Sequence, residues 1–202
     1  PDTAVAQDAS ARMAATFVDL FNNGKADDLM PLNALAMYYE FRELTPLGSQ
    51  GDIMIQNLAD RLAGVDLLDK AASLLEHQVT FRLEKQERSR VGAQLGLIYL
   101  LNRQPSKTLD VLELTGYGDN NDQLMQRRNH LAALSYMRTG QWQQALNLLD
   151  DDYSDEAQYI RLALFWENKD WENVTRTAEE ILAARADITA PLKPLETLAF
   201  LL

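Results

Sequence analysis

The chain has 202 residues, of which 47% are hydrophobic and 24% are charged, and it contains no cysteine. This composition can supply a buried core and argues against a disordered chain, while the lack of cysteine excludes disulfides, thiolate metal sites, iron–sulfur clusters and cysteine nucleophiles. The formal net charge of −11 argues against a general nucleic-acid or acidic-membrane binder, because phosphate contacts require a basic surface.

The compartment of the protein stays open between cytoplasm and periplasm, since proteins of both compartments can lack cysteine. The longest nearly apolar run, Leu95–Leu101, is far shorter than the ~20 residues that span a bilayer, so we expect no direct membrane insertion. No signal peptide is visible. Because the chain begins at Pro1 rather than at a methionine, we expect a mature form or an excised domain.

The first predicted helix spans residues 3–22. Its apolar residues recur at spacings of three and four, which is the period of a helix face, and Gly24 follows as a stop signal. The stripe consists of Val5, Ala9, Met13, Phe17 and Leu20. No segment of the chain shows the convincing alternation of a strand, so we predict an all-α fold.

A second helix is predicted to start at Pro31, because proline is tolerated in the first turn of a helix. Its apolar face would carry Leu32, Leu35, Ala36 and Tyr39. The segment Leu44–Gly51 that follows is the clearest break in the chain. Residues 1–50 are therefore predicted to form an N-terminal helical cap or a degenerate repeat.

From residue 51 onward the predicted helices come in pairs that are joined by short connections. The pairs are 52–63 with 66–82, 85–102 with 105–115, 122–139 with 141–150, and 155–167 with 170–185. Side chains that can cap a helix N-terminus mark several starts, namely Asp52, Asp66, Asn121 or Asp122, and Ser154. We assign residues 51–187 to these repeats. A last helix from Pro191 belongs to a C-terminal capping segment, residues 188–202.

Small residues open the core face of the second helix in each pair, and their spacing is regular. These marker residues are Ala71, Thr108, Ala145 and, as a less regular member, Val174. They lie 37, 37 and 29 residues apart, and periods of 20–50 residues are typical of stacked helical units. One helix pair cannot bury both of its apolar faces, whereas stacked pairs share a continuous core. The sequence therefore predicts an α-solenoid of stacked antiparallel helix pairs.

The segment Gln126–Leu149 carries a pattern of small, aromatic and glycine positions. These positions are Ala132, Ala133, Tyr136, Gly140, Trp142, Ala145 and Leu149. This unit resembles the tetratricopeptide repeat (TPR) family, and Asp52–Leu75 and Ser89–Leu112 match the same pattern in part. A fourth unit fits only with a one-residue shift. The resemblance covers about residues 52–185 and implies a right-handed superhelix, although the family's terminal proline is absent and Arg103 replaces a turn glycine.

No catalytic constellation stands out, and we predict a non-catalytic protein without a cofactor or a metal. The two histidines, His77 and His130, lie on different predicted helices and outside any zinc-binding motif. The acidic segment Asp150–Glu156 lacks the glycine and the final glutamate of an EF-hand calcium loop. Its carboxylates are better explained as favouring the positive end of the helix that begins near Ser154, with Tyr153 packed inward.

The TPR resemblance implies that the first helix of each pair lines a concave surface on which a peptide or a helix of another protein binds. The predicted contact residues are Arg90, Leu97, Leu101, Arg127, His130, Leu134 and Arg138. Their helical spacing places them on one face of each helix, and the mixture of leucine and arginine is common at interfaces. Arg127 and Arg138 would read a carboxylate. The alternative is that the leucines pack on a neighbouring helix.

Charge is distributed unevenly along the chain. Residues 82–107 carry a net charge of +4 and residues 142–182 carry −7, which fits either a solvated face or a polarised surface that orients a partner. The expected partner is another protein or peptide, or a second copy of the chain, and not nucleic acid. Two other functions stay open: a self-assembly module of a larger protein, and a helical accessory domain of an enzyme. Self-assembly would use the terminal stripe of Leu195, Leu198, Leu201 and Leu202.

Overall fold

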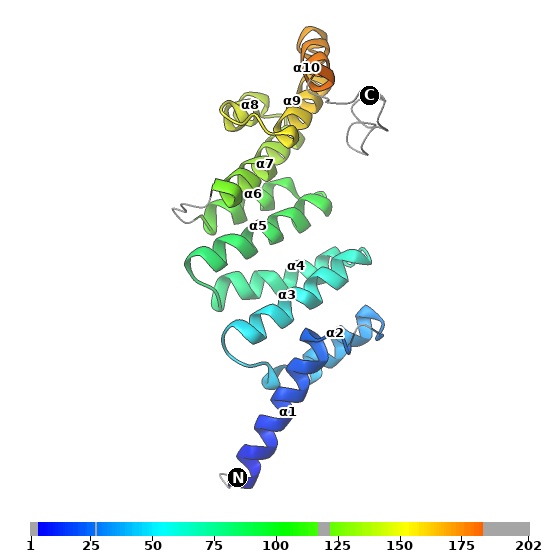
Figure 1. Ribbon diagram of the computed structural model, residues 1–202, viewed down its shortest axis with the longest axis vertical. Coiled ribbons are helices and arrows are strands. Elements are labelled where there is room, and N and C mark those ends of the chain that lie inside the picture. The colour runs from blue at the N-terminus through cyan, green and yellow to red at the C-terminus, as the bar shows by residue number, and fades with distance from the viewer. Residues whose placement is uncertain (1–3, 27, 117–121, 184–202) are drawn as a thin grey trace. The chain divides into compact units, whose positions relative to one another are not determined.

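The computed structural model describes residues 4–26, 28–116 and 122–183 (Figure 1). The chain forms two compact units, Pro1–Asn102 and Arg103–Leu202. Within the described ranges every regular element is a helix, as the sequence predicts. None of these helices is both long enough and apolar enough to cross a membrane.

The first unit contains five α-helices and one 3-10 helix in its described residues. They are α1 (Ala4–Asn22), α2 (Pro31–Glu40), η1 (Arg42–Leu44), α3 (Ser49–Gly64), α4 (Leu68–Phe81) and α5 (Lys85–Leu101). Helix α3 packs against α1, α2 and α4, and α4 packs against α5. The fully buried side chains of this core include Met54, Leu58, Leu62, Leu75 and Leu95.

The two N-terminal helices bury less of their apolar faces than the sequence predicts. In α1, Phe17 is buried, but Val5 and Met13 are exposed, because the N-terminal end of this helix projects away from the other helices of the unit (Figure 1). In α2, Leu35 is buried together with Ala34. The other members of the predicted α2 face, Leu32, Ala36 and Tyr39, are exposed. The short helix α2 therefore buries a narrower strip than predicted.

The predicted break at Leu44–Gly51 contains the short loop between η1 and α3, which is held by a mostly buried ion pair. Helix α3 begins at Ser49, three residues earlier than predicted, so Asp52 lies inside the first turn and does not cap the helix. The Arg82 guanidinium donates through Nε to Asp52 Oδ1 at 2.8 Å and through Nη2 to the Pro46 carbonyl at 2.9 Å. The Asp52 carboxylate thus pairs with the end of α4 instead of the first-turn amides.

The second unit contains five α-helices in its described residues. They are α6 (Pro105–Leu114), α7 (Asp122–Arg138), α8 (Trp142–Leu149), α9 (Asp155–Glu167) and α10 (Trp171–Ala183). Helix α7 packs against α6, α8 and α9, and α9 packs against α8 and α10. Their core cluster consists of Ala133, Ala145, Leu149, Ala157, Ile160 and Leu164. The capping segment predicted at residues 188–202, with its leucine stripe, lies outside the described residues.

The first helix of each pair ends at a residue with left-handed backbone. These residues are Asp66 (φ 63°), Arg103 (φ 57°), Gly140 (φ 75°) and Lys169 (φ 58°). They lie 37, 37 and 29 residues apart, which are the intervals of the marker residues. Three of the four markers, Ala71, Thr108 and Ala145, are completely buried. The repeat predicted from the sequence is therefore a repeat of both turn and core.

Backbone hydrogen bonds close three of these four turns, those at Asp66, Gly140 and Lys169, in the manner of a Schellman motif. The pairs are Leu67 N to Leu62 O at 2.9 Å, Gln141 N to Tyr136 O at 2.8 Å, and Asp170 N to Phe165 O at 2.9 Å. Asp66 therefore belongs to the end of α3. The prediction that Asp66 caps α4 is wrong. Helix α4 begins two residues later, at Leu68.

Arginines connect the second helix of one pair to the first helix of the next. The donor–acceptor pairs are Arg88 with Val79 O, Arg128 with Leu112 O, and Arg161 with Leu149 O. Each accepting carbonyl lies in the last turn of its helix, where carbonyls lack intrahelical partners and the helix dipole is negative. These arginines stabilise helix ends that have no terminal proline.

A reciprocal pair of substitutions tests the turn geometry. A left-handed backbone costs a residue with a side chain about 1 kcal/mol relative to glycine. Because a Cβ at Gly140 would meet no atom within 4 Å, Gly140→Ala should lower the free energy of unfolding by about 1 kcal/mol, whereas Lys169→Gly should raise it by up to about 1 kcal/mol. Urea denaturation followed by circular dichroism measures both. Changes of the same sign in the two variants would contradict the turn assignment.

Candidate functional site

The seven predicted contact residues are divided between the two units. Arg90, Leu97 and Leu101 belong to α5, in the first unit. The Arg90 guanidinium is already engaged within that unit, because its Nη2 donates to Glu87 Oε2 and to Gln56 Oε1, both at 2.8 Å. Leu97 is half-buried and Leu101 is exposed at the end of the helix.

The other four contact residues lie on α7, in the second unit. Arg127 and Arg138 are exposed, and neither has an ion-pair partner among the described residues. Leu134 is half-buried and packs against the core cluster of α7, α8 and α9, which agrees with the packing alternative for this residue. The exposed part of this face is therefore cationic.

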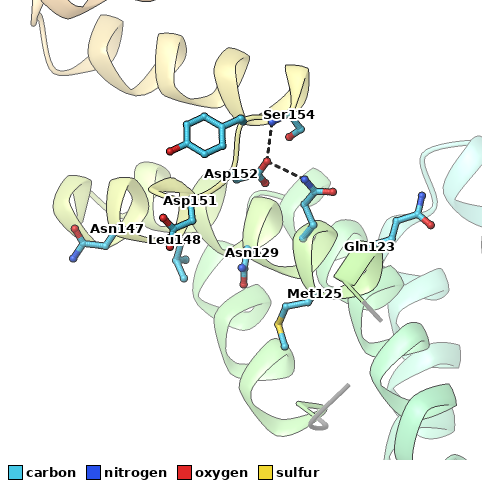
Figure 2. A pocket seen from close by; sticks show the side chains of 10 residues that line it. Gln123, Met125, Asn129, Asn147, Leu148, Asp151, Asp152 and Ser154 are labelled. Carbon is cyan, nitrogen blue, oxygen red and sulfur yellow. Dashed lines mark hydrogen bonds between the residues drawn. The ribbon is translucent and has the colours of Figure 1, made fainter. Parts of the chain in front are cut away.

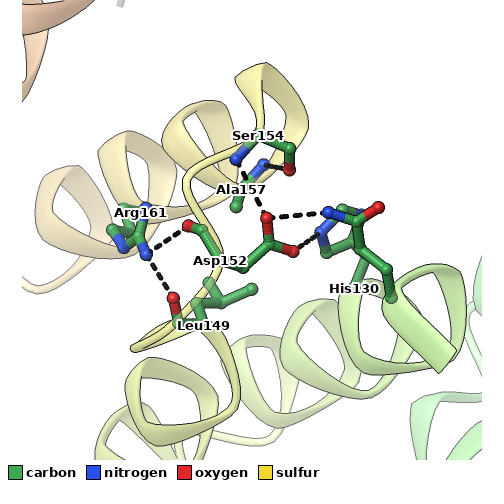
Figure 3. A network of polar contacts seen from close by, with 7 residues as sticks. His130, Leu149, Asp152, Ser154, Ala157 and Arg161 are labelled. Atoms are coloured by element: carbon green, nitrogen blue, oxygen red, sulfur yellow. Dashed lines mark hydrogen bonds and ion pairs between the residues drawn. The ribbon is translucent and has the colours of Figure 1, made fainter. Parts of the chain in front are cut away.

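The imidazole of His130 is held by an aspartate of the loop between α8 and α9. Its Nε2 lies 2.7 Å from Asp152 Oδ2, and the two side chains are only 14% and 13% exposed. The other carboxylate oxygen, Oδ1, accepts from Gln126 Nε2 and from the Ser154 backbone N–H, both at 2.9 Å (Figure 3). Asp152 thereby joins the loop to α7.

Hydrogen bonding decides the ionisation of Asp152. Burial raises the pKa of this carboxyl group, but the hydrogen bonds from Ser154, Gln126 and His130 outweigh it and hold the pKa well below its usual range. The folded protein therefore keeps the carboxylate ionised at any pH at which the unfolded chain is ionised.

Two further contacts fix the corner between α8 and α9. Arg161 Nη2 donates to the Asp152 carbonyl at 2.6 Å and to the Leu149 carbonyl (Figure 3). The Ser154 hydroxyl accepts from the Ala157 amide, which confirms Ser154 as the N-cap of α9. No three acidic, histidine or cysteine side chains of the described chain are grouped to hold a metal ion.

Tyr153 is 81% exposed, so the prediction that it packs inward is wrong. The side chain of its neighbour Asp152 points toward α7 and makes the buried contacts of the loop. The sequence indicates only part of this arrangement. The spacing between Gln126 and His130 places both on one helix face, but nothing local indicates their shared acceptor, Asp152, which is 22 residues from His130.

An open groove of about 930 Å³ lies beside this corner, between α7, α8 and the loop (Figure 2). Its lining residues are Gln123, Met125, Gln126, Asn129, Asn147, Leu148, Asp151, Asp152, Tyr153 and Ser154. They combine four carboxamides, two carboxylates and three apolar or aromatic side chains, without lysine or arginine. The sequence does not reveal this groove, because scattered asparagines and glutamines form no motif.

Two crystal structures of the nearly identical TPR-like repeats of a Podosopora anserina protein, described as a putative kinesin light chain, are similar to this chain. One of them, of a variant with a single substitution, matches with a TM-score of 0.62 at 17% identity, over 87% of this chain and 92% of that chain. The other matches with a TM-score of 0.61 at 16% identity, over 95% of this chain and 100% of that chain. The chain has a TPR-like helical repeat fold.

The TPR-like fold of this chain is divergent. No family model matches the sequence, and the comparison with curated proteins finds no match. Three of the four TPR-like turns use Asp66, Arg103 and Lys169 at the left-handed position where the family pattern has glycine. The expected resemblance and the all-α class are confirmed, and the likeness to the solved structures concerns the fold alone.

Removal of the Asp152 carboxylate should destabilise the second unit. Asp152→Ala leaves His130, Gln126 and the Ser154 amide without their acceptor, so we expect a loss of about 1–3 kcal/mol in the free energy of unfolding at pH 7. The exposed neighbour provides the matched control, since Asp151→Ala should change stability by less than about 0.5 kcal/mol.

The pH dependence of this loss has a defined sign. Because the pKa of Asp152 is lowered by folding, its contribution is fully present above the unfolded pKa of about 4 and is lost as the pH falls through the lower folded pKa. The difference between wild type and Asp152→Ala should therefore shrink as the pH falls below about 4. Chemical denaturation at several pH values checks this, and a difference that grows as the pH falls below about 4 would contradict the assignment.

Proposed function

We propose that this protein is a non-catalytic interaction scaffold whose second unit binds an acidic segment of another protein along the exposed face of α7. TPR-like repeat folds commonly serve as protein-interaction scaffolds. The observation that carries the proposal is the pair of exposed arginines, Arg127 and Arg138, which lack an ion-pair partner in the described part of the chain.

The neighbouring arginine supports this interpretation by contrast. Arg128 is buried and donates to the Leu112 carbonyl and to the Thr115 hydroxyl, so its charge serves the fold. Arg127 and Arg138, in contrast, are exposed cations in a chain that carries 30 acidic and 19 basic residues. Exposed guanidinium groups in such a chain are suited to charge-assisted, bidentate hydrogen bonds with a partner's carboxylates.

The spacing of the two arginines limits what the partner can be. Arg127 and Arg138 are 11 residues apart, which corresponds to about 16 Å along a helix axis. We therefore assign each guanidinium its own carboxylate. In an extended peptide, which advances about 3.3 Å per residue, the two carboxylates would be about five residues apart. In a helical partner they would be about 11 residues apart.

Arg90, Leu97 and Leu101 remain predicted contacts of the first unit. The engaged guanidinium of Arg90 gives them less support than the α7 pair has. The contribution of α7 is therefore the part of the proposal that should be tested first.

A peptide array tests both the charge and the spacing. Peptides that carry two glutamates at varied separations are probed with wild-type protein and with the double variant Arg127→Glu, Arg138→Glu. We expect binding to be strongest near the separation of about five residues that an extended segment requires, and to fall at least about tenfold in the variant. The charge-matched control, Lys70→Glu with Arg176→Glu, changes two exposed cations elsewhere and should keep binding.

Two results would contradict the proposal. Equal loss of binding in the Arg127/Arg138 variant and in the control would indicate a general charge effect. Binding that is independent of the separation of the glutamates would remove the role of the arginine pair.

A further inference from the structure

We propose that the groove at the α8–α9 corner is a second binding site, which takes an arginine side chain of a partner peptide. This inference goes beyond the proposed function, because it concerns other residues and the opposite charge. Met125, Gln126 and Asn129 lie at different positions around α7 from Arg127 and Arg138, since each residue advances the helix by about 100°. The groove and the arginine-bearing face can therefore be tested separately.

The charge of the groove favours a cation. Its ten lining residues include Asp151 and Asp152 but no lysine or arginine. Both oxygens of Asp152 are occupied by bonds from α7 and from Ser154, whereas Asp151 is exposed and has no hydrogen-bond or ion-pair partner among the described residues. Asp151 is thus the carboxylate that is available to a ligand, and charge complementarity selects a basic one.

An aromatic ring accompanies this carboxylate. Tyr153 lines the groove and is 81% exposed, although its backbone lies between two residues that are fixed by hydrogen bonds, Asp152 and Ser154. A large ring that is held in water on a fixed loop can stack against a planar guanidinium. The ring and the carboxylate together favour arginine over lysine, because a planar guanidinium can both stack on the ring and form paired hydrogen bonds.

The other residues that line the groove can contact the aliphatic part of the arginine side chain and the main chain of the peptide. Met125 and Leu148 provide apolar surface for the aliphatic stem of the side chain. Gln123 and Asn129 have carboxamides without hydrogen bonds to the described residues, and each can donate to and accept from a peptide main chain. Asn147 is less available, since it already accepts from Gln143.

An anionic ligand is disfavoured at the same place. The N-terminus of α9 adjoins the groove and would attract an anion, but the hydroxyl of Ser154 already accepts from its first-turn amide. Asp155 and Glu156 are exposed carboxylates of the first turn of α9, and Asp150 is exposed four residues before the N-cap. A phosphate or carboxylate would therefore meet like charge and no cationic side chain of the groove.

The test uses a pair of peptides that differ in one charge. A short glycine–serine peptide with blocked ends carries a single central arginine, and its partner carries citrulline, which has nearly the same shape without the charge. NMR titration of isotopically labelled protein of residues 1–202 should give shifts at Asn129, Asp151 and Tyr153 with a dissociation constant of about 1 mM. The citrulline peptide should bind at least about tenfold more weakly.

Variants of the protein locate the binding. Asp151→Asn and Tyr153→Ala should each weaken the arginine peptide about tenfold, while Tyr153→Phe, which keeps the ring, should bind like wild type. Asp110→Asn is the matched control, because it removes an exposed carboxylate of α6 that does not line the groove. The double variant Arg127→Glu, Arg138→Glu should bind the arginine peptide undiminished, which separates this site from the α7 face.

Three results would overturn the proposal. They are equal affinity for the arginine and citrulline peptides, equal weakening by Asp151→Asn and Asp110→Asn, and shifts confined to residues outside the groove. The altered side chains of Asp151 and Tyr153 are exposed, so their variants should melt like wild type by circular dichroism, and lost binding then reports on the groove and not on unfolding.

Discussion

The left-handed residue that ends the first helix of each pair is the constraint on which the repeat depends. It reverses the chain within a few residues, and the small marker five positions later is buried, as at Ala71, Thr108 and Ala145. Only one of the four turns has glycine, which adopts this backbone without a conformational cost, at the left-handed position. At Asp66, Arg103 and Lys169 a cost of about 1 kcal/mol per turn is offset by the core that the turn assembles.

Arginine side chains provide a second constraint on the repeat, because they hydrogen-bond the second helix of one pair to the first helix of the next. Arg88, Arg128 and Arg161 each donate to a carbonyl in the last turn of the preceding helix. The guanidinium of Arg161 also donates to the Asp152 carbonyl. This contact fixes the α8–α9 loop, which forms one side of the groove. The contact that stabilises the repeat therefore also determines the shape of the candidate binding surface.

The sequence predicts the helices well because helical periodicity and turn spacing are local properties. The predicted pair 155–167 with 170–185 corresponds to α9 at Asp155–Glu167 and to α10 at Trp171–Ala183, and the intervals of 37, 37 and 29 residues recur in the backbone. Side-chain orientation in loops is not local. The sequence alone predicts that Asp52 and the acidic segment of Asp152 belong to helix starts, but their distant partners, Arg82 and His130, decide where the two side chains point.

The orientation of Asp152 divides the side chains of one short loop between the interior of the unit and the solvent. A loop of alternating side chains that turns Asp152 toward α7 leaves Asp151 and Tyr153 facing solvent. The buried carboxylate is paired and so contributes stability, while the exposed carboxylate and ring have no partner within the described part of the chain. On α7 the arginines divide in the same way, since Arg128 is committed to the backbone of α6 and Arg127 is exposed. In the loop and on α7, two residues of the same charge are adjacent in sequence. One of them, Asp152 or Arg128, stabilises the unit, and its neighbour, Asp151 or Arg127, is exposed.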